Sequence, residues 1–195
     1  MEANRLIIFR ARYPLNCWVM LCFAFCVLIV FLSPAAAQQQ EKTANLYSEA
    51  VSADARGETE KAIALYQRVL AAAPDSVPAR SNLAADLAQK GEYQQALAEH
   101  RKALKYDPHN PTVRLNLAIA EYKQAEYEPA AAELLALNQE QPSNRQIVSL
   151  LADCYLRLGR NAEVVALLDP IYKIDPENRV VQYELGTALI RAGQI

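Results

Sequence analysis

Cysteine, histidine and closely spaced carboxylates are the residue types in this chain that could perform nucleophilic or metal chemistry. A cysteine nucleophile needs a histidine base beside it, and Cys154 lies in a different part of the sequence from His100 and His109. The two histidines are nine residues apart, which matches no close metal-ligand spacing. We expect Cys154 to pack as a small apolar residue, His100 to pack inside the fold and His109 to lie in an exposed turn. The pattern predicts no catalytic residue, cofactor or metal site, and therefore a protein that is not an enzyme.

Composition excludes further classes of function. The 195 residues include 20 Lys and Arg against 22 Asp and Glu, a net charge of −2. This balance gives no general attraction to a polyanion, so nucleic acid is not an expected partner. Apolar residues make up 52% of the chain, enough for a folded core, and the five glycines leave little material for phosphate-binding loops. The many Ala, Leu, Glu and Gln residues favour helix.

The first 37 residues have the three parts of a secretory signal peptide. A start with three arginines precedes an apolar run from Leu15 to Leu32, and the small residues Ala35–Ala37 follow. We expect cleavage after Ala37 and a short linker over residues 38–42. The alternative is an uncleaved anchor, since the apolar run approaches the length of a membrane span. Both interpretations place the remainder outside the cytoplasm, either periplasmic or secreted, or held by a single membrane pass.

A period of 34 residues organises the rest of the chain. Four prolines are spaced at this interval, and so are four glycines, with Ala125 taking the place of one further glycine. The prolines are Pro74, Pro108, Pro142 and Pro176, and the glycines are Gly57, Gly91, Gly159 and Gly193. With Thr43 as position 1, the repeats are residues 43–76, 77–110, 111–144, 145–178 and a partial 179–195. We call them repeats 1 to 5 and number positions within each from 1 to 34.

Each repeat is predicted to form two helices. Small residues at positions 8 and 20 allow two helix backbones to approach closely. The glycine at position 15 suits the left-handed residue that ends a helix. Position 34 holds Ser or Asn, which are preferred N-caps for the next repeat. These residues are Ser76, Asn110, Asn144 and Asn178. Because the local signals agree with one another, they favour a regular array of helical pairs.

This pattern resembles the tetratricopeptide repeat family, whose unit is 34 residues long. Residues 82–108 (NLAADLAQKGEYQQALAEHRKALKYDP) fit it closely, as do residues 116–142 and 151–176. The resemblance implies an all-α, right-handed solenoid of helix-turn-helix repeats over residues 43–195, preceded by the N-terminal apolar segment. It also implies a concave groove lined by the first helix of each repeat. The partial fifth repeat stops at Ile195, where a second helix is expected to begin, so we expect a fragment of a longer protein; a natural end is the alternative.

The resemblance also indicates which residues bind a partner, because the family forms its concave face mainly from positions 2, 5, 9, 12 and 13. Members that clamp a peptide carboxylate place Lys and Asn or Arg at positions 5 and 9, and this chain lacks that clamp. An apolar and aromatic strip with a basic edge takes its place, which is typical of protein-binding surfaces. The candidate partner-binding residues are Tyr47, Val51, Leu115, Ile119, Tyr122, Lys123, Asp153, Arg157 and Tyr183.

The expected function is therefore a non-catalytic scaffold outside the cytoplasm that binds a protein or peptide segment in this groove. No small-molecule substrate is expected, and the membrane would be contacted only through residues 15–32 if they stay uncleaved. Two alternatives remain open. One is the substrate-docking region of a larger enzyme that continues after Ile195. The other is a membrane-tethered assembly factor.

Overall fold

The computed structural model of the protein describes residues 34–193. All regular structure within this range is helical, so the predicted all-α class is confirmed there. Nine helices follow one another: α2 (Pro34–Ala55), α3 (Thr59–Ala72), α4 (Val77–Gln89), α5 (Tyr93–Tyr106), α6 (Pro111–Lys123), α7 (Tyr127–Glu140), α8 (Arg145–Arg157), α9 (Asn161–Ile174) and α10 (Arg179–Arg191). The predicted apolar run from Leu15 to Leu32 lies outside the described residues. Among the described helices, none is both long enough and apolar enough to cross a membrane.

The chain divides into two compact units, residues 1–44 and residues 45–195, and the division falls within α2. Residues 38–42, predicted to be a linker, are helical in α2, because their Gln, Glu and Lys residues have good helix propensity. The first helix of repeat 1 therefore begins nine residues before the predicted start at Thr43. Cleavage after Ala37 and the domain bounds at 37 and 42 remain predictions.

The 34-residue period fixes where the helices end. Every first helix stops at position 13, and every complete second helix runs from position 17 to position 30. The residue at position 15 has a positive φ in all five repeats, a conformation that glycine adopts without steric cost. Repeat 3 places Ala125 there with a φ of 60°, although alanine is disfavoured in this region. The side chains of Ser76, Asn110, Asn144 and Asn178 each accept a hydrogen bond from a backbone N–H of the next helix, as predicted.

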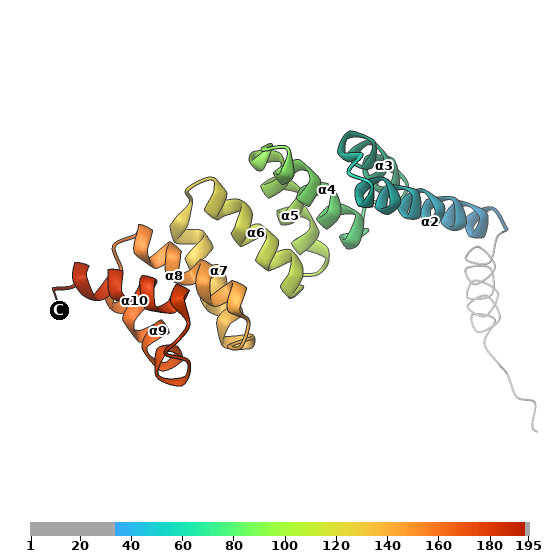
Figure 1. The fold of residues 1–195 in the computed structure, drawn as a ribbon. Helices are drawn as coiled ribbons and strands as arrows, with labels where there is room; N and C mark the ends of the chain where they lie inside the picture. Colours follow the sequence, from blue (N-terminus) through green and yellow to red (C-terminus); the bar gives the residue numbers. More distant parts are fainter. Residues whose placement is uncertain (1–33, 194–195) are drawn as a thin grey trace, which may run out of the picture. The chain divides into compact units, whose positions relative to one another are not determined.

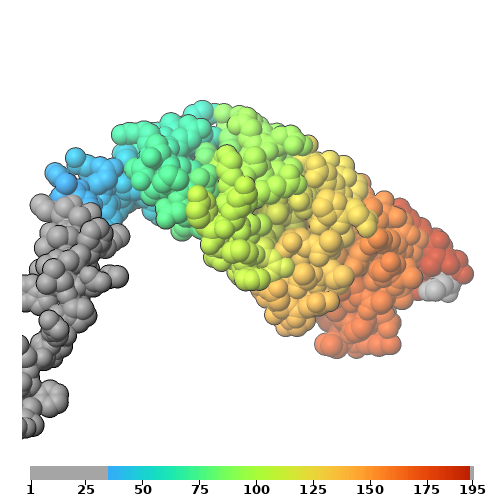
Figure 2. All heavy atoms as spheres, turned by 180° about the vertical axis from the view of Figure 1, so that it is seen from behind, coloured from blue at the N-terminus to red at the C-terminus, as the bar shows by residue number. Residues whose placement is uncertain are grey.

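Packing between repeats separates an inner from an outer row of helices. The first helices contact each other along the array, α4 with α6, α6 with α8 and α8 with α10. Within the described residues, no two second helices contact each other to a similar extent. The first helices therefore line the inner side of the array over residues 45–193, and the second helices cover the outer side (Figure 1). In Figure 2 these residues form an unbroken row of packed repeats from teal to red.

Apolar clusters between the helices hold the array together. Position 24 contributes a large side chain in every complete repeat, and its residue is at most 1% exposed in all four. Those residues are Tyr66, His100, Leu134 and Leu168. The predicted packing of His100 is thus confirmed, as is that of Cys154, which is fully buried. His109 lies in an exposed turn, as predicted.

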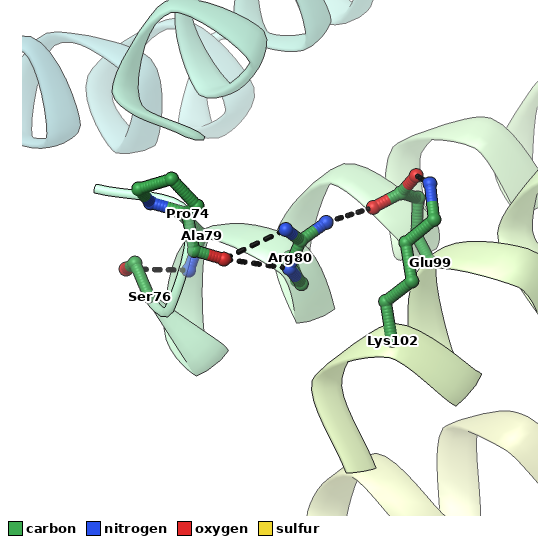
Figure 3. Close-up of polar contacts among 6 residues, drawn as sticks. All are labelled: Pro74, Ser76, Ala79, Arg80, Glu99 and Lys102. Atoms are coloured by element: carbon green, nitrogen blue, oxygen red, sulfur yellow. Dashed lines mark hydrogen bonds and ion pairs between the residues drawn. The ribbon is translucent and has the colours of Figure 1, made fainter. Parts of the chain in front are cut away.

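An arginine at position 4 connects the two helices of repeat 2 and of repeat 3, and Figure 3 shows the contacts of the one in repeat 2. In repeat 2, Arg80 donates to the backbone carbonyl of Pro74 at 2.7 Å and to the carboxylate of Glu99 at 2.7 Å. In repeat 3, Arg114 donates to Glu133 and, at 2.6 Å, to Glu140. Each arginine thus joins the first and second helices of its own repeat, in addition to the apolar clusters.

Candidate functional site

Helices α6 and α8 bring three of the predicted groove residues into one polar and aromatic cluster. Position 12 of α6 carries Tyr122, whose hydroxyl donates a hydrogen bond to the carboxylate of Asp153 at position 9 of α8. One turn further along α8, Arg157 donates to the same carboxylate oxygen at 3.4 Å. The ring of Tyr127 packs edge-on against Tyr122 with ring centroids 5.6 Å apart, and the Arg157 guanidinium lies 6.0 Å from the Tyr127 centroid. We call Tyr122, Tyr127, Asp153 and Arg157 the tyrosine–arginine cluster.

Hydrogen bonding and charge within this cluster shift its pKa values in a consistent direction. The hydrogen bond to Asp153 raises the pKa of Tyr122, and burial adds to the effect. The charge of Asp153 raises the pKa of Arg157. Tyr122 therefore stays protonated and Arg157 stays charged at neutral pH. The cluster presents a protonated phenol, a guanidinium paired with Asp153 and two aromatic rings, all of which can contact a ligand.

Apolar residues extend the surface beside the cluster. Leu115 and Ile119, at positions 5 and 9 of α6, are half-buried, and Leu115 packs against the apolar cluster of repeats 3 to 5. In repeat 5, Tyr183 is 75% exposed. Lys123 is exposed and has no ion-pair partner within residues 34–193. The inner face of repeats 3 to 5 thus combines accessible apolar area with an uncompensated positive charge.

The two remaining candidates, Tyr47 and Val51, lie on α2 in repeat 1 and do not join this surface. The Tyr47 hydroxyl accepts a hydrogen bond from Asn82 at 3.3 Å, and its ring packs 6.0 Å from the ring of Tyr66. Repeat 2 separates them from Leu115, because its own residues at positions 5 and 9 are Ser81 and Ala85. The structure therefore divides the predicted strip into two groups of residues.

Sequence reasoning missed two features of this inner face. One is Tyr127, which is not among the candidate residues, although its position 17 directly follows the turn after position 13. The other is a pocket of about 450 Å³ between α8, α9 and α10. One sequence difference could have indicated this pocket: position 4 is Val148 in repeat 4, whereas it is arginine in repeats 2 and 3.

The cysteine and the buried histidine of the described residues are held in their uncharged forms by burial. Burial raises the pKa of the Cys154 thiol to about 11, so it remains a protonated, inaccessible side chain. Burial also lowers the pKa of His100 to about 4, which keeps its imidazole neutral. No group of three or more His, Cys, Asp or Glu residues within residues 34–193 is arranged to hold a metal ion.

Comparison with known proteins identifies the repeat. Two family profiles, each described as a tetratricopeptide repeat, match residues 47–111 and 87–154. Together they span residues 47–154, more than half of the chain. The chain belongs to the tetratricopeptide repeat family. No curated protein sequence matches it at a significant level.

Solved structures of tetratricopeptide repeat proteins share this fold. One from Parabacteroides merdae is 17% identical with a TM-score of 0.72, and the alignment covers 79% of this chain and 61% of that one. MamA from Desulfovibrio magneticus is 20% identical with a TM-score of 0.72, covering 78% of this chain and 86% of MamA. YrrB, described as a TPR protein with an unusual peptide-binding site, is 18% identical with a TM-score of 0.72, covering 82% of each chain. The present chain thus spans about three fifths of the first of these proteins and most of the other two.

Family membership sets the general class of function. Tetratricopeptide repeat proteins are scaffolds that bind protein or peptide partners. The α-solenoid built from these repeats is therefore a protein-interaction fold.

Proposed function

We propose that this protein is a non-catalytic scaffold that binds an extended protein segment along the inner face of repeats 3 to 5, outside the cytoplasm. The observation that carries the proposal is the tyrosine–arginine cluster beside the half-buried Leu115 and Ile119. Tyr and Arg residues held rigidly next to apolar surface are the side chains that contribute most to protein-binding interfaces. Rigidity also lowers the entropy lost on binding, since these side chains are already fixed by mutual contacts.

The charges on the inner face of repeats 3 to 5 indicate which charge the partner segment has. Asp153 already neutralises Arg157, and Arg191 donates to the backbone carbonyl of Leu156 at 3.3 Å. By contrast, Lys123 has no ion-pair partner among the described residues. A segment with apolar side chains against Leu115 and Ile119 and a carboxylate near Lys123 would complement this face. We therefore expect a partner segment that is apolar with at least one acidic residue.

Selection from a displayed peptide library tests this proposal. Peptides selected on the full chain should bind the Ile119→Glu variant at least about tenfold more weakly, because the new carboxylate would be buried against apolar groups. Adding Leu115→Glu should remove the remaining binding. The matched control is Leu135→Glu, which changes a 42% exposed leucine on the outer helix α7 and should leave affinity unchanged.

Folding of each variant is checked by its thermal transition, because Leu115 contributes to an apolar cluster. A folded Ile119→Glu variant that binds the selected peptides as tightly as the original chain would refute the groove assignment. If Ile119→Glu and Leu135→Glu lose the same amount of peptide affinity, the groove assignment is refuted as well, since the change in net charge would then explain the result. Lys123→Gln should weaken binding of acidic peptides and reduce its dependence on salt.

Export is the second part of the proposal, and it is supported by the basic, apolar and small-residue segments of residues 1–37. Cell fractionation with N-terminal sequencing tests it. A protein found outside the cytoplasm that begins at Gln38 supports export with cleavage, whereas an intact N-terminus in the membrane fraction supports the anchored alternative. Recovery of the protein in the cytoplasm would refute export.

A further inference from the structure

The pocket between α8, α9 and α10 exists because repeat 4 lacks a side chain that repeats 2 and 3 possess. In repeat 2, Arg80 extends from position 4 until its guanidinium lies 5.9 Å from the ring centroid of Tyr106 at position 30. In repeat 3, Arg114 extends from the same position to the carboxylate of Glu140, also at position 30. Two internal arginines thus cross the space between positions 4 and 30.

Repeat 4 leaves this space open. Its position 4 is Val148, which is too short to cross, and its position 30 is Ile174, which is 86% exposed. Both residues line the pocket of about 450 Å³, together with Leu168 and Ile171 from α9. The opening therefore occupies the region that an arginine side chain fills in the two preceding repeats, and its walls are apolar enough to contact the methylene groups of such a side chain.

A buried carboxylate with free hydrogen-bonding capacity lines the same pocket. Glu184, at position 6 of α10, accepts one hydrogen bond through Oε1 from the hydroxyl of Ser149 at 3.3 Å. Its Oε2 is shielded from solvent and accepts no hydrogen bond from any residue between 34 and 193. Burial raises the pKa of Glu184, and the charge of Asp153 adds to this effect. A buried acceptor without a partner is costly, and a cation at this point would remove the cost.

Among the described residues, no basic side chain that lines the pocket pairs with Oε2 of Glu184. Asp175 lines the pocket and adds a second negative group. Arg145 is the basic residue among the lining residues, but it makes no hydrogen bond to Glu184 within the described part of the chain. The pocket therefore combines an apolar wall, a carboxylate oxygen without a donor and an excess of acidic over basic lining groups.

We propose that this pocket binds an arginine side chain of the partner segment, in the place that Arg80 and Arg114 occupy in repeats 2 and 3. The inference rests on the proposed function, since it specifies one residue of the segment that the inner face binds. The methylene groups of the arginine contact Val148 and Ile171, and its guanidinium pairs with the carboxylate of Glu184, whose Oε2 turns toward the pocket to accept the hydrogen bond. Arginine fits better than lysine because its weakly hydrated, planar guanidinium can lie against apolar side chains and still donate to a carboxylate.

Nuclear magnetic resonance titration of the full chain with N-acetyl-arginine-N-methylamide tests the proposal directly. This probe should shift the methyl signals of Val148, Ile171 and Val180 in a saturable manner. The corresponding norleucine and glutamate derivatives should bind at least about tenfold more weakly, because one lacks the charge and the other reverses it. Equal binding of the norleucine derivative, tighter binding of the glutamate derivative, or no saturable shift with arginine would each overturn the proposal.

Two variants separate a specific site from a general apolar contact. Glu184→Gln keeps the shape of the side chain and should weaken arginine binding at least about tenfold, because the guanidinium loses its anionic partner. Val148→Arg gives repeat 4 the residue of repeats 2 and 3 and should abolish binding by filling the pocket. The matched control Arg145→Gln removes a charge from the same rim and should leave binding unchanged or stronger.

Unchanged arginine affinity in Glu184→Gln would overturn the proposal even if Val148→Arg fails to fold. The small probe reaches the pocket without occupying the surface of Leu115 and Ile119. Loss of peptide binding along the inner face, with the arginine site intact, would therefore count against the proposed function alone. Peptide binding that survives while the arginine derivative fails to bind would count against this inference alone.

Discussion

Repeats 2 and 3 differ from repeat 4 in how the first helix is joined to the second, although the backbone unit is the same. Position 4 carries Arg80 and Arg114 in the first two, and each pairs with a glutamate at position 23, 19 residues later in the chain. Repeat 4 has Val148 and Leu167 at these positions, and both belong to its apolar cluster. In repeats 2 and 3 an arginine side chain spans positions 4 and 30, whereas in repeat 4 a pocket opens between these two positions.

The difference shows that the repeat tolerates two kinds of interior contact outside its defining positions. Positions 8, 15, 20 and 24 fix the backbone, because they set the close helix crossings, the turn and the core. Position 4 is not one of these positions, so its residue can either stabilise the fold or bind a partner. Exchanging residues between repeats therefore reveals which role each position has.

The largest expected effect comes from the histidine that repeat 2 places at position 24, where repeats 3 and 4 have leucine. His100 is 1% exposed, and burial lowers its pKa from 6.5 to about 4. As the pH falls from about 6.5 to about 4, the unfolded chain takes up a proton before the folded chain does, so the free energy of unfolding decreases by up to about 3 kcal/mol. The contribution is fully present above about pH 6.5.

Urea denaturation at a series of pH values measures this dependence in the original chain and in His100→Leu. The variant should lack this part of the pH dependence, and it should be more stable by about 1 kcal/mol at neutral pH because a buried nitrogen without a partner is removed. Identical pH profiles for the two proteins would show that His100 is accessible to protons in the folded state.

A smaller effect is expected from making repeat 3 resemble repeat 4 at position 4. Arg114→Val removes the guanidinium that pairs with Glu133 and Glu140, and the side chain of Glu133 is only 28% exposed. The free energy of unfolding should fall by about 1–3 kcal/mol, because carboxylates in partly buried positions lose their partner. Lys102→Ala removes a 51% exposed lysine from Glu99, which keeps Arg80 as its partner; it is the control and should cost less than about 0.5 kcal/mol. A loss as small as that of the control would mean that apolar packing alone holds repeat 3.

The smallest expected effect concerns the turn of repeat 3. Ala125 has a φ of 60°, where the other four repeats have glycine. Ala125→Gly should raise the free energy of unfolding by about 0.5–1 kcal/mol, because the relief of steric strain exceeds the entropy that glycine adds to the unfolded chain. Thermal unfolding measures the change, and Gly159→Ala in repeat 4 is the reciprocal variant with the opposite sign. Destabilisation by Ala125→Gly would contradict the strained turn.

Much of the fold could be predicted because its signals repeat. The prolines and glycines at constant spacing predicted both the array of helical pairs and the left-handed residues at position 15. The burial of His100 also followed, since position 24 is apolar elsewhere. The longer α2 did not follow from the period, because residues 34–42 precede the first repeat and are helical through their own composition.

The candidate site could be predicted only in part. Periodicity placed Tyr122, Asp153 and Arg157 on first helices of adjacent repeats, which is where they meet. It gave no reason to include Tyr127, which reaches the cluster from a second helix. Periodicity also could not show that Tyr47 accepts a hydrogen bond from Asn82 and packs against Tyr66, since these contacts depend on the spacing between helices.

The sequence by itself determined the secondary structure, the repeat length and the faces of the helices, because these depend on local preferences that recur every 34 residues. The tertiary structure decided which side chains cross from one helix to another. Arg80 and Arg114 reach from position 4 to the second helix of their repeats, while Val148 leaves space beside Glu184. That outcome depends on side-chain length measured against the distance between packed helices, a quantity that exists only once the repeats are stacked.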